Sequence, residues 1–147
     1  MAGLGRTIAN LARHRRSASG GAPRDPGRLR AVTGFGPNPG NLRMLAHVPA
    51  RLAPRAGLVV VLHGCRQSAA GYDLGTGWSE LAERHGFAVL YPEQQQANNP
   101  NNCFSWFEPA RIARGAGEAA SIHAMVAWMI ETHGLDAGRV FITGLSA

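Results

Sequence analysis

The feature that most constrains the fold of this chain is an uninterrupted run of five apolar residues, LVVVL, at positions 58–62. The run does not alternate with polar residues, so it predicts a strand that is covered on both faces, as strands are in a parallel sheet. Two further, mostly apolar runs, residues 87–91 and 140–143, have the length of strands. Parallel strands are joined by long crossover connections, which are usually helices.

The segments between these runs have the period of helices. A first helix is expected after Thr76, a possible N-terminal cap, and before Gly86, whose position suits a left-handed stop. The residues of its buried stripe recur at i, i+3, i+4 and i+7: Trp78, Leu81, Ala82 and His85. A second helix is expected over residues 118–133. The order strand, helix, strand, helix, strand predicts an α/β fold, with a mostly parallel sheet and helices on both faces.

The rest of the chain adds two strands and a polar segment. Strands are expected at residues 28–33 and 42–48. Pro92 is expected to close the strand at 87–91, and residues 93–102 contain too much Gln, Asn and Pro to be expected to pack. In open α/β sheets ligands bind beyond the carboxyl ends of the strands, so the segments that follow the three apolar runs are expected to face one site.

The positive charge of the chain is concentrated at its N-terminus. The net charge is +6, and residues 1–30 contain seven Arg against Asp25 alone, whereas the remainder contains eight basic and eight acidic side chains. Specific nucleic-acid binding is therefore not expected of the folded part. We expect residues 1–26 to form a basic extension, either a solvated tail or a short amphipathic helix with a linker, and residues 27–147 to belong to one domain. No stretch has the ~20 apolar residues of a membrane span, and no secretory signal is recognisable.

The last four residues, Gly144-Leu145-Ser146-Ala147, follow an expected strand. They supply four of the five positions of Gly-x-Ser-x-Gly, the nucleophile elbow in which small residues flank a serine on a tight turn between strand and helix. Four residues occur by chance in many proteins, but the preceding strand supports the assignment. Ser146 is therefore the candidate nucleophile.

A second element of the same chemistry follows the strand at 58–62. There the loop His63-Gly64-Cys65 occupies the place where α/β-hydrolases donate a backbone N–H to the oxyanion hole, together with the residue after the nucleophile. Cys65 and Ala147 fit these two roles, with His63 and Gly64 in support. We interpret His63 as a structural hydrogen bonder, because the catalytic base follows the serine in this fold. The alternative is a plain glycine turn beside an incidental histidine.

Several spaced motifs, all in one order, carry a resemblance to a known family. They are LHGCRQ at 62–67, GYD at 71–73, GW at 77–78, HGF at 85–87, YPEQ at 91–94, CFSWF at 103–107 and TGLSA at 143–147. Over roughly residues 40–147 the chain resembles the polyhydroxybutyrate-depolymerase family of serine esterases, α/β-hydrolases whose relatives include feruloyl and acetylxylan esterases. The resemblance implies hydrolysis of short-chain polyhydroxyalkanoates or similar esters through an acyl-enzyme on Ser146. A feruloyl- or acetylxylan-type carbohydrate esterase is the alternative.

The resemblance also implies where the substrate lies. It places Cys65 at the oxyanion loop and Trp106 in the loop that lines the substrate cleft. A second interpretation, compatible with the first, makes Trp106 a core anchor for a long loop. The implied partner is a small-molecule or polymeric ester, and no cofactor is implied.

The two cysteines, Cys65 and Cys103, lie in the loops after consecutive parallel strands and could meet, and the resemblance implies a disulfide between them. Such a bridge would contribute about 3–4 kcal/mol in the chain-entropy model. It favours an extracellular location, whereas the lack of a recognisable signal leaves a cytoplasmic one open. Two cysteines without a nearby ligand at suitable spacing do not predict a metal site.

The acid and base of a catalytic triad are not found in the expected order. In this fold they follow the serine, and only Ala147 follows Ser146. We therefore expect an inactive fragment of a serine carboxylic-ester hydrolase. A degenerate, non-catalytic remnant and a binding module that acts through its basic tail are the alternatives.

Overall fold

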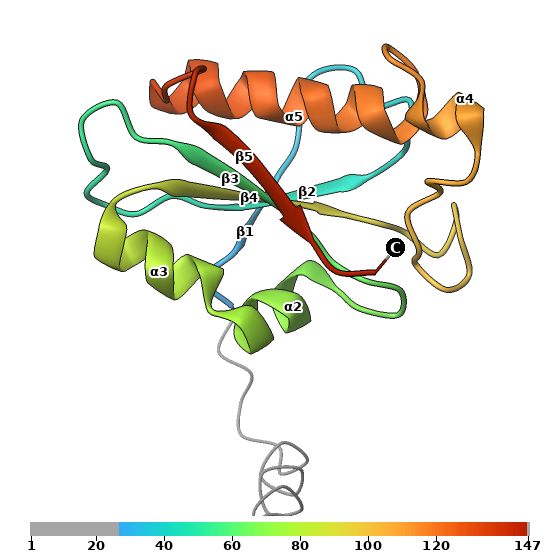
Figure 1. Ribbon diagram of the computed structural model, residues 1–147, viewed down its shortest axis with the longest axis horizontal. Helices are drawn as coiled ribbons and strands as arrows, with labels where there is room; N and C mark the ends of the chain where they lie inside the picture. Colours follow the sequence, from blue (N-terminus) through green and yellow to red (C-terminus); the bar gives the residue numbers. More distant parts are fainter. Residues whose placement is uncertain (1–26, 147) are drawn as a thin grey trace, which may run out of the picture.

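The computed structural model describes residues 27–146 (Figure 1). The expected basic extension, residues 1–26, and the expected second oxyanion donor, Ala147, lie outside the described residues. The elements in chain order are β1 (Arg30–Val32), β2 (Arg43–His47), β3 (Leu58–Leu62), α2 (Ala69–Thr76), α3 (Trp78–His85), β4 (Ala88–Glu93), α4 (Pro109–Ile112), α5 (Gly117–His133) and β5 (Val140–Gly144).

The five strands form one mixed sheet in the order β1-β2-β4-β3-β5. The three apolar runs of the sequence make its parallel part, in which β3 lies between β4 and β5. The two early strands pair antiparallel, β1 with β2 and β2 with β4. Because Leu58 is level with both Ala88 and Val140, the three parallel strands begin together, and the loops after them leave the same edge of the sheet.

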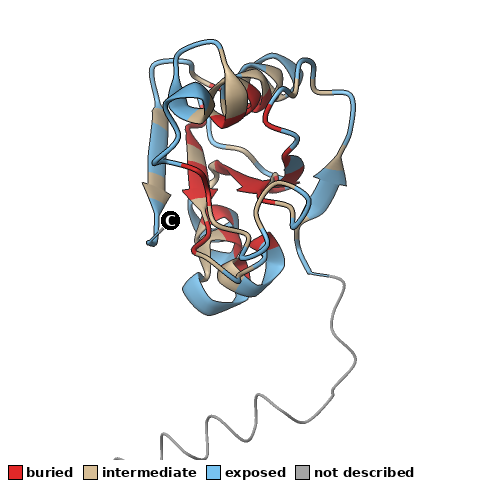
Figure 2. Ribbon diagram, turned by 90° about the vertical axis from the view of Figure 1, so that its right-hand side faces the viewer, coloured by how far each residue is buried: buried red, intermediate tan, exposed pale blue. Residues whose placement is uncertain are grey.

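The strand β3, which lies between β4 and β5, is covered on both faces, as its unalternating sequence predicts. Leu58 and Val60 belong to the apolar cluster under α5, whereas Val61 belongs to the cluster under α2 and α3. Figure 1 shows α5 over one face of the sheet and α2 with α3 over the other, and Figure 2 shows the buried residues concentrated between these layers. The α/β-hydrolase type of layering expected from the sequence is confirmed.

The two expected helices are present, with one correction at the start of the first. Gly86 ends α3 in the left-handed conformation, with φ of 69°. Thr76 is not the cap of this helix; it is the last residue of α2, a helix that the sequence pattern did not predict, and Gly77 separates the two with φ of 73°. The helix α5 buries Met125 and Met129 against the sheet. None of the helices in the described range is long and apolar enough to cross a lipid bilayer.

The end of β4 differs from the expectation in two ways. Pro92 lies inside β4 and does not end it. The last residue of β4 that pairs with β3 is Leu90, two residues earlier, so the missing N–H of Pro92 removes no hydrogen bond between β3 and β4. Glu93 and Gln94, expected to be solvated, are buried. The carboxylate of Glu93 pairs with Arg43 and accepts a 2.8 Å hydrogen bond from the backbone N–H of Ala69, at the start of α2. Polar side chains are therefore buried at the carboxyl end of β4 because they form hydrogen bonds with backbone groups of the neighbouring segments.

A buried network fixes α2 and α3 to β4. The carboxylate of Asp73 accepts hydrogen bonds from the hydroxyl of Tyr91 at 2.7 Å and from the backbone N–H of Ser79 at 2.9 Å. Burial, and then the hydrogen bond to Asp73, raise the pKa of Tyr91, so its phenol stays protonated in the folded protein.

We expect Tyr91→Phe to lower the free energy of unfolding by about 1.5–3 kcal/mol, because a charged acceptor loses a buried donor. Since the folded pKa is raised, the protonated phenol favours the folded state fully below the ordinary tyrosine value of about 10, and this contribution is lost as the pH rises further. Urea unfolding between pH 7 and 11 measures both effects. Tyr72→Phe, which changes the residue directly before Asp73 on α2, is the control. An equal loss of stability in that variant would contradict the assignment.

Candidate active site

Three segments lie beyond the carboxyl ends of the parallel strands. They are the candidate oxyanion loop (residues 63–67, after β3), the candidate cleft loop (residues 103–108, beyond β4) and the candidate elbow (residues 144–146, at the end of β5), called the oxyanion loop, the cleft loop and the elbow below. A Cβ atom placed on Gly64 would lie 3.6 Å from Cβ of Ser146 and 3.1 Å from the carbonyl oxygen of Leu145. The oxyanion loop therefore lies against the elbow, and only glycine fits between them without a shift of the backbone.

The elbow has the backbone geometry that a nucleophilic serine requires. Ser146 has φ of 57°, a left-handed conformation that is uncommon for a residue with a side chain, and it is exposed. The backbone N–H of Leu145 donates to the carbonyl of Leu62 at 3.2 Å, which holds the turn against β3. A side chain on Gly144 would lie 3.1 Å from Cβ of Leu62. A strand that enters a strained turn with a serine at its tip is the arrangement expected of a nucleophile elbow.

The ring of His63 is buried and both of its nitrogens are engaged. Nε2 lies 3.1 Å from the backbone N–H of Gln94, which can only donate, so Nε2 is the acceptor and carries no proton. Nδ1 therefore carries the proton of the neutral ring and donates to the carbonyl of Gly64 at 2.8 Å. The ring also packs on Phe104, with centroids 5.1 Å apart. A ring with both nitrogens occupied has no free position from which to accept the proton of Ser146.

The hydrogen bond from His63 fixes more than the carbonyl of Gly64. A peptide unit is planar and trans, so the carbonyl of Gly64 and the N–H of Cys65 point in opposite directions. Because the hydrogen bond holds the Gly64 carbonyl toward His63, the Cys65 N–H points away from His63. The side chain of Gln67 holds the preceding peptide, because its Oε1 accepts from the Gly64 N–H at 2.7 Å.

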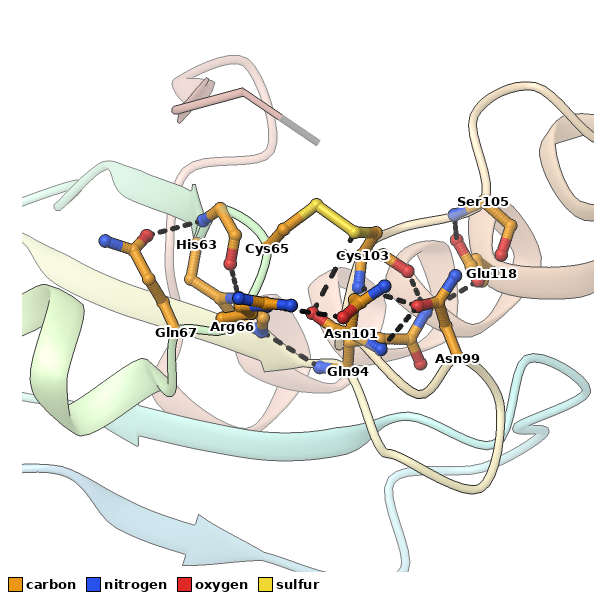
Figure 3. The surroundings of a disulfide bond; sticks show 11 residues. His63, Cys65, Arg66, Gln67, Gln94, Asn99, Asn101, Cys103, Ser105 and Glu118 are labelled. Carbon is orange, nitrogen blue, oxygen red and sulfur yellow. Dashed lines mark hydrogen bonds between the residues drawn. A yellow bond between two sulfur atoms is a disulfide. The ribbon is translucent and has the colours of Figure 1, made fainter.

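Cys65 and Cys103 form a disulfide, as the resemblance implies (Figure 3). The bond joins the oxyanion loop to the cleft loop across 38 residues of sequence. A backbone hydrogen bond of 2.6 Å, from the N–H of Arg66 to the carbonyl of Asn101, runs beside it. The oxyanion loop is therefore joined covalently to the cleft loop and, through its backbone, to the segment just before it.

The cleft loop presents two aromatic side chains to solvent. Trp106 is 64% exposed and Phe107 is 57% exposed, and their rings meet edge to face with centroids 5.9 Å apart. Trp106 is therefore not a core anchor, and that interpretation is wrong. The buried aromatic residue of this loop is Phe104.

Two buried polar residues of the site, Gln94 and Glu118, were missed by the sequence analysis. The amide Nε2 of Gln94 donates to Oε1 of Glu118 at 2.8 Å, and Oε2 of Glu118 accepts from the backbone N–H of Ser105 at 2.9 Å. Gln94 stands in the YPEQ motif that carried the resemblance, which was the available signal. Glu118 looked like an ordinary acidic residue in the first turn of a helix.

The disulfide gives a direct test of this geometry. We expect no free thiol in the oxidised chain under denaturing, non-reducing conditions, and we expect the pair Cys65→Ala and Cys103→Ala to lower the free energy of unfolding by about 3–4 kcal/mol, because the unfolded chain gains freedom. Thiol titration and chemical unfolding are the measurements. Two free thiols in protein prepared in an oxidising compartment would contradict the structure.

The sheet, the elbow and the loop after β3 together define the class of the chain as an α/β-hydrolase. Residues 44–147 match the family described as Esterase PHB depolymerase, and the chain belongs to this family. The resemblance seen in the sequence is thereby confirmed.

Relatives within this family are depolymerases and carbohydrate esterases. The chain is 55% identical over 119 residues to poly(3-hydroxyalkanoate) depolymerase C of Paucimonas lemoignei, a match that covers 81% of this chain and 28% of that protein. It is 38% identical over 122 residues to acetylxylan esterase A of Aspergillus oryzae, a match that covers 82% of this chain and 39% of that protein. The chain thus spans well under half the length of these relatives.

Two solved esterase and depolymerase structures have a similar fold. The acetyl xylan esterase from Aspergillus awamori superposes with a TM-score of 0.73 at 37% identity, over 80% of this chain and 42% of that one. The poly(3-hydroxybutyrate) depolymerase LpqC from Bordetella parapertussis has a TM-score of 0.58 at 17% identity, over 80% of this chain and 42% of that one, which supports the fold alone.

Proposed function

We propose that Ser146 is the nucleophile of a serine carboxylic-ester hydrolase. The observation that carries the proposal is the left-handed backbone of Ser146 beside Gly64, where a Cβ atom added to the glycine would lie 3.6 Å from Cβ of Ser146. In the reaction, Ser146 Oγ bonds to the ester carbonyl carbon, and the carbonyl electron pair moves to its oxygen. The resulting tetrahedral intermediate breaks its bond to the leaving oxygen, which takes up the proton lost by Ser146 and departs as the alcohol, leaving an acyl-enzyme. Water then adds to the acyl carbon, and the acid departs as the Ser146 hydroxyl is restored.

The backbone N–H groups of Cys65 and Ala147 stabilise the oxyanion in this proposal. The hydrogen bond from His63 to the Gly64 carbonyl supports the role of Cys65, because it fixes the orientation of the Cys65 N–H before substrate arrives. A donor that is oriented in advance costs no reorganisation during the reaction, and loss of one such donor costs about 10²–10³ in rate.

The reaction also needs a base that accepts the proton of Ser146 and an acid that orients the base. In this fold both follow the serine in the chain, and within residues 1–147 only Ala147 does so. His63 is unsuited to the task because both of its nitrogens are engaged. In this proposal the chain supplies the nucleophile and the oxyanion loop, and His63 is not the base.

The substrate class we favour is short-chain polyhydroxyalkanoates or similar esters. The 55% identical relative, a poly(3-hydroxyalkanoate) depolymerase, supports it. The exposed Trp106 and Phe107, in the cleft loop tied to Cys65, offer aromatic faces to an apolar acyl chain. Acetylated or feruloylated carbohydrates are the second candidate, because acetylxylan esterases are 38% identical.

The compartment we infer is an oxidising one, and an extracellular location fits it best. The disulfide between Cys65 and Cys103 carries this inference, because disulfides persist in secreted proteins and are rare in the cytosol.

A hybrid enzyme tests the role of Ser146. In it, residues 27–147 replace the matching segment of the acetyl xylan esterase from Aspergillus awamori, which then supplies the rest of the fold. We expect a fluorophosphonate to label Ser146, and Ser146→Ala to lower p-nitrophenyl butyrate hydrolysis by at least about 10³-fold. The 147-residue chain alone is expected to show no Ser146-dependent hydrolysis, because serine is a weak nucleophile without a base.

Ser68→Ala, which removes the exposed side-chain cap of α2 but no group of the proposed site, is the serine control in the hybrid. It should lower stability slightly and leave both labelling and hydrolysis in the folded hybrid unchanged. Labelling at any residue other than Ser146 of the grafted segment would refute the assignment.

Trp106→Ala tests the substrate cleft in the same hybrid. We expect the KM for hydroxybutyrate oligomers to rise about tenfold, since loss of one large aromatic contact removes roughly 1–1.5 kcal/mol of binding. The kcat/KM for p-nitrophenyl acetate, whose acetyl group offers no extended acyl chain to the aromatic pair, should change much less. Leu74→Ala, another exposed apolar side chain, is the control. Equal effects on both substrates would count against a cleft role.

A further inference from the structure

Gln94 is the point at which the polar contacts behind the site converge (Figure 3). It is 2% exposed and directly follows β4. Its backbone N–H donates to Nε2 of His63 at 3.1 Å, and its side-chain Nε2 donates to the carbonyl of Cys103 at 3.2 Å and to Oε1 of Glu118 at 2.8 Å. Its Oε1 accepts from Nδ2 of Asn98 at 2.6 Å. One residue therefore contacts the oxyanion loop through its backbone and the cleft loop through its side chain.

Glu118 completes the connection from the other side. It is 4% exposed and stands in the first turn of α5, where the helix dipole favours a negative charge. One carboxylate oxygen accepts from the side chain of Gln94 and the other from the N–H of Ser105, the residue before Trp106. The carboxylate thereby fixes both Gln94 and the cleft loop to α5.

We propose that Gln94 and Glu118 are positioning residues that hold the oxyanion loop and the cleft loop at a fixed separation, independently of the disulfide. The role rests on the proposed function, because these loops are the parts of the proposed site that bind the oxyanion and the acyl chain. The pair orients the Cys65 N–H through His63. It fixes the start of the cleft loop through Cys103 and Ser105. Neither residue acts on the substrate itself.

The chemistry of the pair requires an amide facing a carboxylate. Two N–H donors, from Gln94 and Ser105, converge on the two oxygens of Glu118, and a carboxylate accepts both. An amide at position 118 would satisfy only one of them and would turn its own N–H group toward the other. The loops should therefore separate in Glu118→Gln although the shape of the side chain is unchanged, and the thiols of the reduced protein should meet less often.

The test uses the 147-residue chain and measures no hydrolysis, so an inactive hybrid enzyme would not affect it. The equilibrium constant for forming the Cys65–Cys103 disulfide is measured in glutathione buffers, and the ¹⁵N resonances of His63 report its hydrogen bonds. For Glu118→Gln we expect the constant to fall about tenfold, the size of one lost hydrogen bond to a charged group. We also expect the Nε2 resonance of His63 to shift, because its bond to the Gln94 N–H weakens.

Asp73→Asn is the matched control. Asp73 is also a buried carboxylate that accepts backbone and side-chain donors, but its partners, Ser79 and Tyr91, belong to neither loop. It should lower stability without changing the disulfide constant or the His63 resonance. If Asp73→Asn changes both as much as Glu118→Gln does, the pair only stabilises the fold, and the proposal is overturned.

An exchange of the two groups covers the case in which Glu118→Gln does not fold. The double variant Gln94→Glu and Glu118→Gln restores an amide facing a carboxylate, and the new amide oxygen at position 118 can accept from the Ser105 N–H. Gln94→Glu alone places two carboxylates together. We expect the double variant to have a disulfide constant several-fold above that of Gln94→Glu alone, because the contact between positions 94 and 118 is restored, but below that of the parent chain, because position 94 no longer donates to the Cys103 carbonyl. A double variant that is no better than Gln94→Glu alone would overturn the proposal.

Discussion

The hydrogen bond from the Gln94 N–H to Nε2 of His63 is the interaction on which the organisation of the site depends. It selects the tautomer of His63, and the tautomer decides that Nδ1 donates to the Gly64 carbonyl. Because the peptide is planar, that bond orients the Cys65 N–H. A backbone donor at the end of β4 thus sets the direction of a donor in the loop after β3, and both strands are held by the parallel ladder between them.

The arrangement is possible because the residues around the elbow are small or strained. Gly64 leaves room for the turn at Ser146, and Gly144 lets β5 approach Leu62. The left-handed backbone of Ser146 costs on the order of 1–3 kcal/mol and persists only where surrounding structure enforces it. That enforcement comes from the ladder between β3 and β5, which continues to Gly144, and from the bond between Leu145 and Leu62.

Much of this fold was predictable from the sequence, because apolar runs and helical periods report burial. The run at 58–62 predicted a strand covered on both faces, and the candidate elbow and oxyanion loop followed from the residues after the strands. Helix α2 was missed because its sequence, AAGYDLGT, contains two glycines and little periodicity. Gln94 and Glu118 were missed for another reason: a buried polar residue is recognised by its partners, and partners that are distant in sequence have no spacing that reveals them.

The two halves of the site differ in how they are supported. In the described part of the chain, β5 pairs with β3 alone, and Phe141 and Ile142 on it are more than half exposed. The oxyanion loop, in contrast, is held by His63, by the side chain of Gln67, by the disulfide and by the Arg66 backbone. Its geometry therefore arises from residues that precede the serine in the chain. Preorganisation of the proposed oxyanion donor is thus a property of the β3–β4 half of the sheet, whereas the position of the proposed nucleophile depends on how well β5 is held against it.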